Sequence, residues 1–386
     1  MMAPRKIQQY KFEIPEIIFG RGLLSQIGIC AKRLGGKKVF LVSDEGLLNA
    51  GWVDYATRSL KEAGLAHVFY GQVTSNPKDF EIEQGYKEYV RHRADVIVGL
   101  GGGSAMDAAK GIAILGSNGG RIQDFRGINM IQRPLPPLVL CPTTCGTGSD
   151  VSQFAIINDS KKHCKFTIMS RCVAPDISLT DPDTLQTLPQ EYLGSTALDA
   201  LSHAVEAYLS VAASTLTDVN ALEALRVLKS NLHQALTERN PQAMENLARA
   251  SQHAGMAFSN ALLGVGHALA HPIGGLYDVN HGYINAILLP EVLRYNFPVS
   301  EHRIAALAQA LGHNNFGSTK YAEEIVLEEV SNLARAGEAP SSLKALGVRS
   351  DDFTVLAQQA MEDVCILTSP RQSDSEDLQG ILNKVY

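Results

Sequence analysis

The chain has 386 residues, of which 45% are hydrophobic and 19% charged, and its mean hydropathy is −0.02. This length exceeds the ~250–300 residues at which a single hydrophobic core stops growing, so two domains are expected. The net charge is −6 and no dense run of Lys and Arg occurs, which argues against a nucleic-acid partner. No apolar run reaches the ~18–20 residues of a membrane span, so no membrane partner is predicted.

The cysteine pattern bears on the compartment. The six cysteines show no CxxC spacing, and the start of the chain lacks the apolar core of a signal peptide. In a chain of this length, such a pattern predicts reduced thiols rather than a disulfide framework. A cytoplasmic location is therefore expected.

The first half of the chain alternates short apolar segments with amphipathic ones. The strands are predicted at 38–43, 67–70, 95–100 and 135–141, and the helices at 52–63 and 79–92. Alternation of this kind is typical of a parallel sheet with helices on its faces.

From about residue 187 the pattern becomes helical. Long helices are predicted at 194–211, 215–238 and 241–263, with several more towards the end of the chain. The stretch at 181–189, which contains Pro and Asp residues, is the predicted hinge between the two halves. We therefore expect an α/β Rossmann-like domain over residues 1–186 and an all-α domain over residues 187–386.

A glycine-rich turn follows the strand predicted at 95–100. Gly101-Gly-Gly-Ser104 opens a helix, and free N–H groups at a helix start favour an anion such as a pyrophosphate. The spacing is not GxGxxG, so a tight turn without a ligand remains the alternative. A second loop, Pro142-Thr-Thr-Cys-Gly-Thr-Gly-Ser-Asp150, also follows a strand and has the small hydroxyl residues of a phosphate or ribose wall.

Asp44 lies at the end of the first predicted strand. A carboxylate at this position accepts hydrogen bonds from ribose hydroxyls and repels a 2′-phosphate, which favours NAD over NADP. From local sequence alone, a solvated turn aspartate is an equal alternative.

The second half contains a cluster of potential metal ligands. Asp199 and His203 are four residues apart and share one helix face, and His267 and His271 repeat this spacing. His281 follows shortly afterwards. Asp199 with three of the four histidines offers one oxygen and three nitrogen ligands, a set that suits Fe²⁺ or Zn²⁺. The spacing does not say which three histidines bind.

Taken together, these stretches resemble the iron-containing (group III) alcohol dehydrogenase family. The resemblance rests on Gly101–Ser104 with Asp107 and Lys110, on the loop 142–150, on Asp199-Ala-Leu-Ser-His203, and on the long motif from Gly264 to Gly282. It extends from Phe19-Gly-Arg-Gly22 to Pro370-Arg371, so it covers nearly the whole chain. It implies a dehydroquinate synthase-like fold, with a catalytic cleft between a Rossmann-like and a helical domain.

The resemblance also implies roles for individual residues. It marks Asp199, His203, His267 and His281 as metal ligands and places His271 beside the substrate and nicotinamide, where it is a candidate proton relay. It marks Asp44 as the ribose acid and Asn76 as a residue near the nicotinamide ribose or the substrate. The other residues that it places around the cofactor are Gly101, Gly102, Gly103, Ser104, Asp107, Thr143, Thr144, Thr147, Ser149, Lys165 and Leu179.

The function implied is that of a metal-dependent NAD(H) alcohol dehydrogenase or aldehyde reductase acting on a small primary alcohol or diol. Fe²⁺ is the expected metal, with Zn²⁺ as the alternative, and a homodimer is the smallest assembly expected. Three other interpretations stay open: a zinc-dependent polyol dehydrogenase of the glycerol type, a dehydroquinate synthase-like cyclase, and a non-catalytic NAD-binding assembly protein.

Two residues depart from the family pattern. Cys145 stands where Ser or Ala is usual, and Asp150 where Glu is usual. A cysteine in the cofactor loop leads to the expectation that this loop is sensitive to oxidation.

Overall fold

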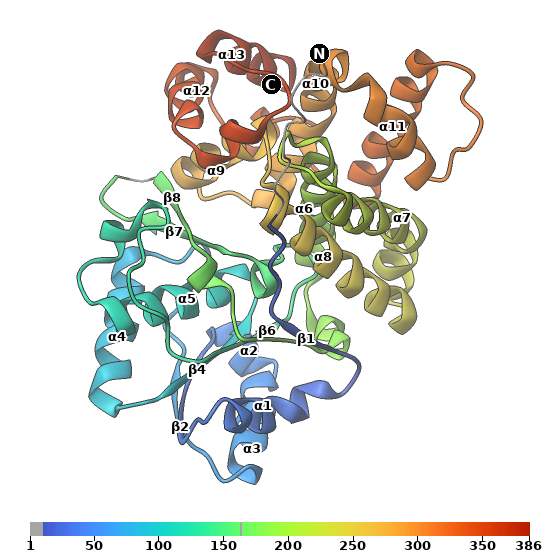
Figure 1. Cartoon of the computed structure of the whole chain (residues 1–386). Helices are drawn as coiled ribbons and strands as arrows, with labels where there is room; N and C mark the ends of the chain where they lie inside the picture. Colours follow the sequence, from blue (N-terminus) through green and yellow to red (C-terminus); the bar gives the residue numbers. More distant parts are fainter. Residues whose placement is uncertain (1–10, 163) are drawn as a thin grey trace, which may run out of the picture.

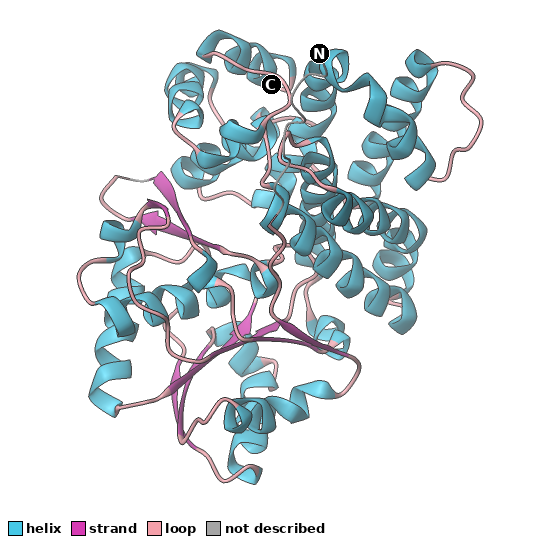
Figure 2. Cartoon of the chain, in the orientation of Figure 1, coloured by secondary structure: helices cyan, strands magenta, loops and turns pink. Residues whose placement is uncertain are grey.

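The computed structural model describes residues 11–162 and 164–386. It has an α/β part, drawn in blue to green in Figure 1, and a helical part, drawn in olive to red. Figure 2 shows that the described strands all lie in the α/β part. The two-part fold predicted from the sequence is therefore confirmed.

The main sheet has six parallel strands. In spatial order they are β1 (Glu16–Phe19), β9 (Ile177–Thr180), β6 (Leu138–Pro142), β4 (Val96–Gly101), β2 (Lys38–Val42) and β3 (Ala66–Tyr70). The first and last strands of this order lie at the two edges. The sequence analysis predicts β2, β3, β4 and β6 but not β1 and β9.

Helices cover both faces of this sheet. They are α1 (Ile27–Arg33), α2 (Glu45–Asn49), α3 (Trp52–Glu62), α4 (Asp79–His92) and α5 (Gly103–Asn118). Successive side chains of a strand point to opposite faces, so Phe40 and Val42 pack with α4 and α5, whereas Val39 and Leu41 pack with α1 and α3. Burial on both faces explains why the strands are continuous apolar runs.

A second, three-stranded sheet lies beside the first. It consists of β5 (Gly127–Ile128), β8 (Cys164–Met169) and β7 (Phe154–Asp159), in which β7 and β8 are antiparallel. The sequence analysis predicts none of these strands, because β8 mixes polar and apolar residues without a clear run. Figure 1 shows β7 and β8 reaching up to α9 (Val265–Tyr277), which packs against β8.

The helical part begins with α6 (Gln190–Leu209), after the 3-10 turn Pro182–Thr187. The other helices are α7 (Thr215–Glu238), α8 (Pro241–Ala261), α10 (His281–Ala310), α11 (Thr319–Ala336), α12 (Phe353–Met361) and α13 (Ser375–Lys384). Among the described residues, no helix is both long enough and apolar enough to cross a membrane.

Helix α6 is the centre of the helical core. It is buried along almost its whole length because α7, α8 and α10 pack around it. Its buried face includes Asp199, His203 and Glu206, which are polar residues at helical spacing in an otherwise apolar environment. Buried polar groups need partners, so this face of α6 is where a functional site is expected.

Candidate active site

A cavity of about 980 Å³ lies between the α/β part and the helical part. Both parts contribute to its lining, so it is open to a ligand that spans them. Sixteen of the residues predicted from the sequence line it: Asp44, Asn76, Gly102, Gly103, Ser104, Asp107, Thr143, Thr144, Thr147, Ser149, Lys165, Asp199, His203, His267, His271 and His281.

Two predicted cofactor residues do not line the cavity. Leu179 is fully buried in β9, inside the core between the main sheet and α1 and α3, which argues against its prediction as a cofactor contact. Gly101 shapes the turn instead of lining the cavity. Its φ of 154° is a conformation that residues with a Cβ rarely adopt, and it turns the chain from β4 into α5.

The glycine-rich turn leaves the start of α5 open to a ligand. Gly102 is the N-cap residue and has no side chain to satisfy the first N–H groups of the helix. Gly103 lies against the other loop, because a Cβ built at this position meets the Thr147 side chain at 2.9 Å. The two predicted cofactor loops are thus adjacent, with unpaired helix N–H groups between them, as an anion requires.

Asp107 and Ser149 line the cavity but already bind protein groups. The Ser149 hydroxyl donates to Asp107 Oδ1 at 2.6 Å, and the Ile156 N–H donates to Asp107 Oδ2. On the same helix, the buried Lys110 donates to the carbonyl oxygens of Ser152 and Phe154. These contacts fasten the stretch 149–156 to α5, so Asp107 and Lys110 act on the shape of the cofactor loop.

Asp44 and Asn76 lie in the part of the cavity formed by the α/β domain. Asp44 caps α2 by accepting the Leu47 N–H, which leaves its second carboxylate oxygen for another donor. Asn76 has a φ of 52°, and its backbone N–H donates to Ser104 Oγ. Its side chain points to the helical domain, where it donates to Asp278 Oδ1 at 2.5 Å.

One carboxylate oxygen lies at the centre of the histidine cluster. Asp199 Oδ1 is 3.9 Å from Nε2 of His203, 3.7 Å from Nε2 of His267 and 3.8 Å from Nε2 of His281. A metal with bonds of about 2.1 Å separates tetrahedral ligands by roughly 3.4 Å. In this four-residue cage, the ligand atoms of Asp199, His203 and His267 all lie within 4.8 Å of one another, as a divalent ion needs, whereas His281 approaches this group through Asp199 and lies outside it.

Asn285 supports the view that this cage suits a cation. Its Nδ2 group lies 2.9 Å from Asp199 Oδ1, 3.0 Å from Nε2 of His267 and 3.2 Å from Nε2 of His281, so these acceptor atoms converge on one electropositive group. The buried Nδ1 of His281 and Oδ1 of Asn285 have no hydrogen-bond partner among the described residues. The lone pairs of Asp199 Oδ1 and of the two imidazole nitrogens thus point to one place and have few other hydrogen-bond donors, which fits a bound metal ion.

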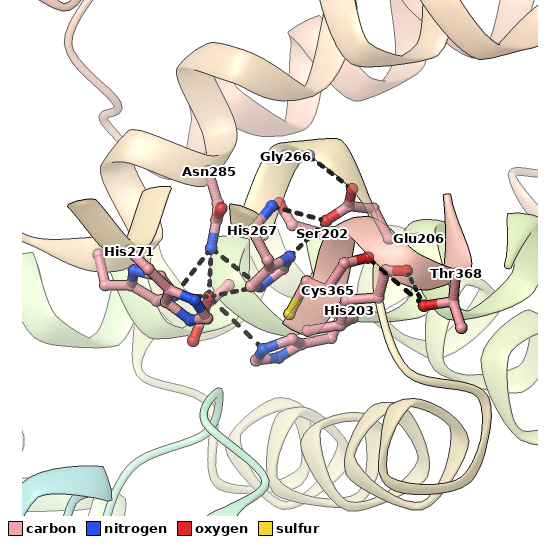
Figure 3. Close-up of polar contacts among 12 residues, drawn as sticks. Ser202, His203, Glu206, Gly266, His267, His271, Asn285, Cys365 and Thr368 are labelled. Carbon is pink, nitrogen blue, oxygen red and sulfur yellow. Dashed lines mark hydrogen bonds and ion pairs between the residues drawn. The ribbon is translucent and has the colours of Figure 1, made fainter. Parts of the chain in front are cut away.

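The outer nitrogens of two histidines fix the orientation of their rings. His203 Nδ1 donates to the Gly146 carbonyl oxygen at 3.2 Å, and His267 Nδ1 donates to the Glu206 carboxylate. A proton on Nδ1 leaves the lone pair on Nε2, which is the nitrogen that faces Asp199. Figure 3 shows His267 between Glu206 on one side and Asn285 on the other.

His271 belongs to a neighbouring group. Its Nδ1 donates to Asp363 Oδ2 at 2.7 Å, and its ring lies parallel to that of His281, with 5.4 Å between the ring centroids. The structure thus pairs His271 with a carboxylate of the C-terminal segment, whereas the other three histidines surround Asp199. This arrangement agrees with the position that the resemblance implies for His271, which is off the metal and beside the substrate and nicotinamide.

The electrostatics of the cage follow from burial and charge. Burial opposes ionisation of Asp199, but His203, His281 and His267 outweigh it and lower the pKa of Asp199 below its usual range. Burial lowers the pKa of His203 to about 4. Burial also opposes the charge on His267, yet the nearby carboxylates of Asp199 and Glu206 raise its pKa to about 9, so a metal that binds Nε2 displaces a proton from this ring. Asp199 is therefore an anion at neutral pH and His203 a neutral ligand.

Cys145 does not fit the expectation of oxidation sensitivity. Its side chain is fully buried, with Sγ 3.5 Å from Thr196 Oγ1, and burial raises its pKa to about 11. A thiol that is neither exposed nor ionised reacts slowly with oxidants. Its burial argues against the expectation.

The sequence analysis missed three polar residues next to the histidines. Two of them carried a usable signal: Glu206 follows His203 by three residues, and Asn285 follows His281 by four, so each shares a helix face with a predicted ligand. The third, Asp363, comes from the loop after α12, and no local pattern announces it.

Comparison with known proteins places the chain in a family. The family model described as iron-containing alcohol dehydrogenase matches residues 15–182, and the model of the C-terminal part of the Fe-containing alcohol dehydrogenase family matches residues 194–386. The chain belongs to the iron-containing alcohol dehydrogenase family. The predicted class, an oxidoreductase acting on CH–OH groups, is confirmed.

Relatives match over nearly their full lengths. A 1,3-propanediol dehydrogenase of Citrobacter freundii is 38% identical over 384 residues, covering 98% of this chain and 99% of the relative. An NAD-dependent methanol dehydrogenase of Bacillus methanolicus is 33% identical, covering 95% and 97%. A crystal structure of a 1,3-propanediol oxidoreductase aligns with a TM-score of 0.95 and 38% identity, covering 98% of this chain and all of the other.

Proposed function

We propose that the chain catalyses reversible hydride transfer between a small primary alcohol or diol and NAD. Asp199, His203, His267 and His281 hold a divalent metal, with Fe²⁺ as the first candidate and Zn²⁺ as the second. The observation that carries this proposal is the position of Asp199 Oδ1, less than 4 Å from three imidazole nitrogens at the wall of the cavity. Membership of the iron-containing family and the names of the relatives support it.

The cofactor site follows from the two adjacent loops. The open start of α5 receives the pyrophosphate, Asp44 accepts from the adenosine ribose, and Thr143, Thr144 and Thr147 form the polar wall. Lys165 lies further along the cavity, on the side of Asp199 and Asp278. An extended dinucleotide bound in this way brings its nicotinamide towards the histidine cage.

The chain's own residues position the substrate and move a proton. A divalent metal, when bound, supplies a Lewis acid that lowers the pKa of the alcohol group. Phe258 stacks on His203 with ring centroids 4.3 Å apart and, with Phe154 and Leu263, forms an apolar wall for the carbon chain of the substrate. His271, oriented by Asp363, exchanges the hydroxyl proton with solvent.

Three alternatives make different use of the same cavity. A polyol dehydrogenase of the glycerol type needs only one Asp and two His, so His281 is then dispensable. A dehydroquinate synthase-like cyclase gains little support, because the matched family is that of the alcohol dehydrogenases. A non-catalytic assembly protein has no need for the intact cage, or for the carboxylate partners of His267 and His271.

Metal analysis combined with an alcohol panel tests the proposal. Protein purified without oxygen is analysed for metal content and assayed with NAD⁺ and primary alcohols from methanol to butanol, with 1,3-propanediol included. We expect about one metal per chain and NADH formation with at least one alcohol. His267→Ala should lose the metal, whereas His271→Ala should retain it and turn over slowly. Loss of metal from His271→Ala would overturn the ligand assignment.

Location and assembly complete the proposal. We place the enzyme in the cytoplasm as a homodimer or a larger homo-oligomer. The six cysteines form no disulfide, which is what a reducing compartment favours. Light scattering of the purified protein measures its mass, and a mass of one chain would contradict the dimer.

A further inference from the structure

The motif Gly264-Val-Gly-His267 contains two glycines that the metal ligands alone do not explain. Neither glycine has a left-handed backbone conformation. A Cβ built at Gly264 meets Glu206 Oε1 at 2.9 Å, and one built at Gly266 meets both carboxylate oxygens of Glu206 at 3.0 and 3.1 Å. The glycines therefore make room for a carboxylate that comes from α6.

Glu206 occupies the N-terminus of α9. Gly264, the N-cap residue, offers no side-chain cap, and Glu206 takes its place by accepting the Gly266 N–H at 2.8 Å and the His267 N–H at 3.1 Å. The same carboxylate accepts from His267 Nδ1 (Figure 3). Glu206 is 4% exposed, so solvent does little to weaken these contacts.

The three histidines of the cage differ in what holds their outer nitrogen. His267 has a carboxylate partner, His203 has the neutral Gly146 carbonyl, and His281 Nδ1 has no partner among the described residues. A carboxylate that accepts a hydrogen bond from one imidazole nitrogen makes the other nitrogen more basic, and therefore a stronger ligand for a metal. Together with Asp199, Glu206 also brings two negative charges to a site proposed for a doubly charged ion.

We propose that Glu206 is a positioning residue for the metal, which fixes the ring of His267 through Nδ1 and slows the loss of the ion. This inference rests on the proposed function, because it requires that the cage binds a metal. Glu206 acts through His267 and the start of α9, and it does not touch the substrate. Outer partners of this type change metal affinity by about 10–100-fold.

Two variants separate the charge of Glu206 from its position. Glu206→Gln keeps an oxygen that accepts the Gly266 N–H but removes the charge. Gly264→Ala keeps the charge but pushes the end of the side chain away, because its Cβ meets Oε1. Asp363→Asn is the matched control, since it alters the other carboxylate–imidazole pair of the cavity without touching the cage.

The experiment measures the release of metal from the loaded full-length protein into an excess of a coloured chelator at constant pH. We expect release to be about 10–100 times faster in Glu206→Gln and Gly264→Ala than in the wild type, and unchanged in Asp363→Asn. The Co²⁺-loaded proteins add a second readout, since a weaker imidazole donor shifts the visible absorption of the ion. If Glu206→Gln does not fold, Gly264→Ala decides alone.

The outcomes distinguish this inference from the proposed function. A wild-type chain that takes up no stoichiometric metal overturns the proposed function and this inference with it. Metal uptake by the wild type, with the same release rate and cobalt spectrum in Glu206→Gln, overturns this inference alone. A lower melting temperature of the metal-free variant without faster release shows that Glu206 only caps α9, and also overturns it.

Discussion

Asn76 and Asp278 form a direct hydrogen bond across the cavity, although 202 positions separate them in the chain. Asn76 belongs to the loop after β3 and Asp278 to the end of α9, and both have left-handed backbone conformations, with φ values of 52° and 51°. Both residues line the cavity, so this contact joins the two parts of the chain beside the proposed cofactor site. We expect this contact to restrain a dinucleotide bound in the cavity.

Asp278→Ala should therefore release NADH faster than the wild type. Because the contact is partly exposed, its loss is worth about 1 kcal/mol, which corresponds to a roughly fivefold faster dissociation. Stopped-flow fluorescence of bound NADH measures this rate. Asp351→Ala, at an exposed aspartate outside the cavity, is the control. Equal dissociation rates in the wild type and Asp278→Ala would show that the contact does not restrain the cofactor.

Asp363 should matter for turnover and not for metal binding. Its carboxylate accepts from His271 Nδ1, and although burial opposes its charge, His271 and the Cys365 N–H lower the pKa of Asp363. Asp363→Asn removes the charge that stabilises a protonated His271, so kcat should fall about tenfold or more. Metal content should remain that of the wild type.

The control for Asp363 is Asp352→Asn, which alters another aspartate of the same region. Asp352 binds Tyr277 and Arg349, and among the described residues it has no hydrogen bond or ion pair with a histidine. Steady-state kinetics and metal analysis of both variants provide the comparison. A fall in kcat of equal size in Asp352→Asn would assign the effect to general disturbance of the C-terminal segment.

Lys110 should stabilise the fold by fastening the cofactor loop. Its ammonium group is fully buried and donates to the carbonyl oxygens of Ser152 and Phe154. Lys110→Met leaves both oxygens without this donor, which should cost about 3 kcal/mol of unfolding free energy. Chemical denaturation measures the loss, and Lys87→Met, at an exposed lysine of α4, should cost nearly nothing.

The stability contributed by Lys110 also depends on pH. Burial lowers its pKa to about 8, although Asp107 and Asp150 oppose this shift, whereas the unfolded chain has the ordinary value of 10.5. Between these values the unfolded state binds more protons, so the wild type gains stability as pH rises from 8 to 10.5. The stability difference between wild type and Lys110→Met should therefore widen over this range, and a constant difference would contradict the buried charge.

The fold could be predicted where the sequence pattern is local. Helices α4 and α7 have the predicted bounds, because each has a clear start and a clear period. Helix α6 begins four residues before its predicted start, since a helix buried on every face has no apolar stripe to mark its ends. The hairpin of β7 and β8 was missed because its strands are stabilised by contacts with α5 and α9.

In the site, too, residues marked by a local sequence pattern could be predicted, whereas those brought in by long-range packing could not. Ligand spacing on one helix predicts Asp199 with His203, but only the packing of α9 and α10 against α6 brings His267 and His281 to them. The family position of Leu179 says little about which face of its strand the side chain occupies, and the structure buries this side chain in the core with α1 and α3. Asp363 could not be predicted at all, since its pairing with His271 depends on how the C-terminal segment folds back.

Cofactor binding should weaken in alkaline solution because of Lys165. Burial lowers the pKa of this lysine to about 8, although Asp199, Asp278 and Asp107 oppose the shift. Its ammonium group is charged below this pH and can attract the cofactor phosphates, and it becomes neutral above it. The Kd for NADH should therefore rise about tenfold per pH unit above pH 8, until the pKa of the complex is reached.

A titration of NADH fluorescence between pH 6.5 and 9.5 tests this dependence. Lys165→Met should bind NADH weakly at every pH and should lack the inflection near 8. Lys87→Met is the control, because Lys87 is an exposed lysine of α4 that does not line the cavity. If Lys165→Met kept the alkaline loss of affinity, another group would be responsible, and Lys165 would not belong to the cofactor site.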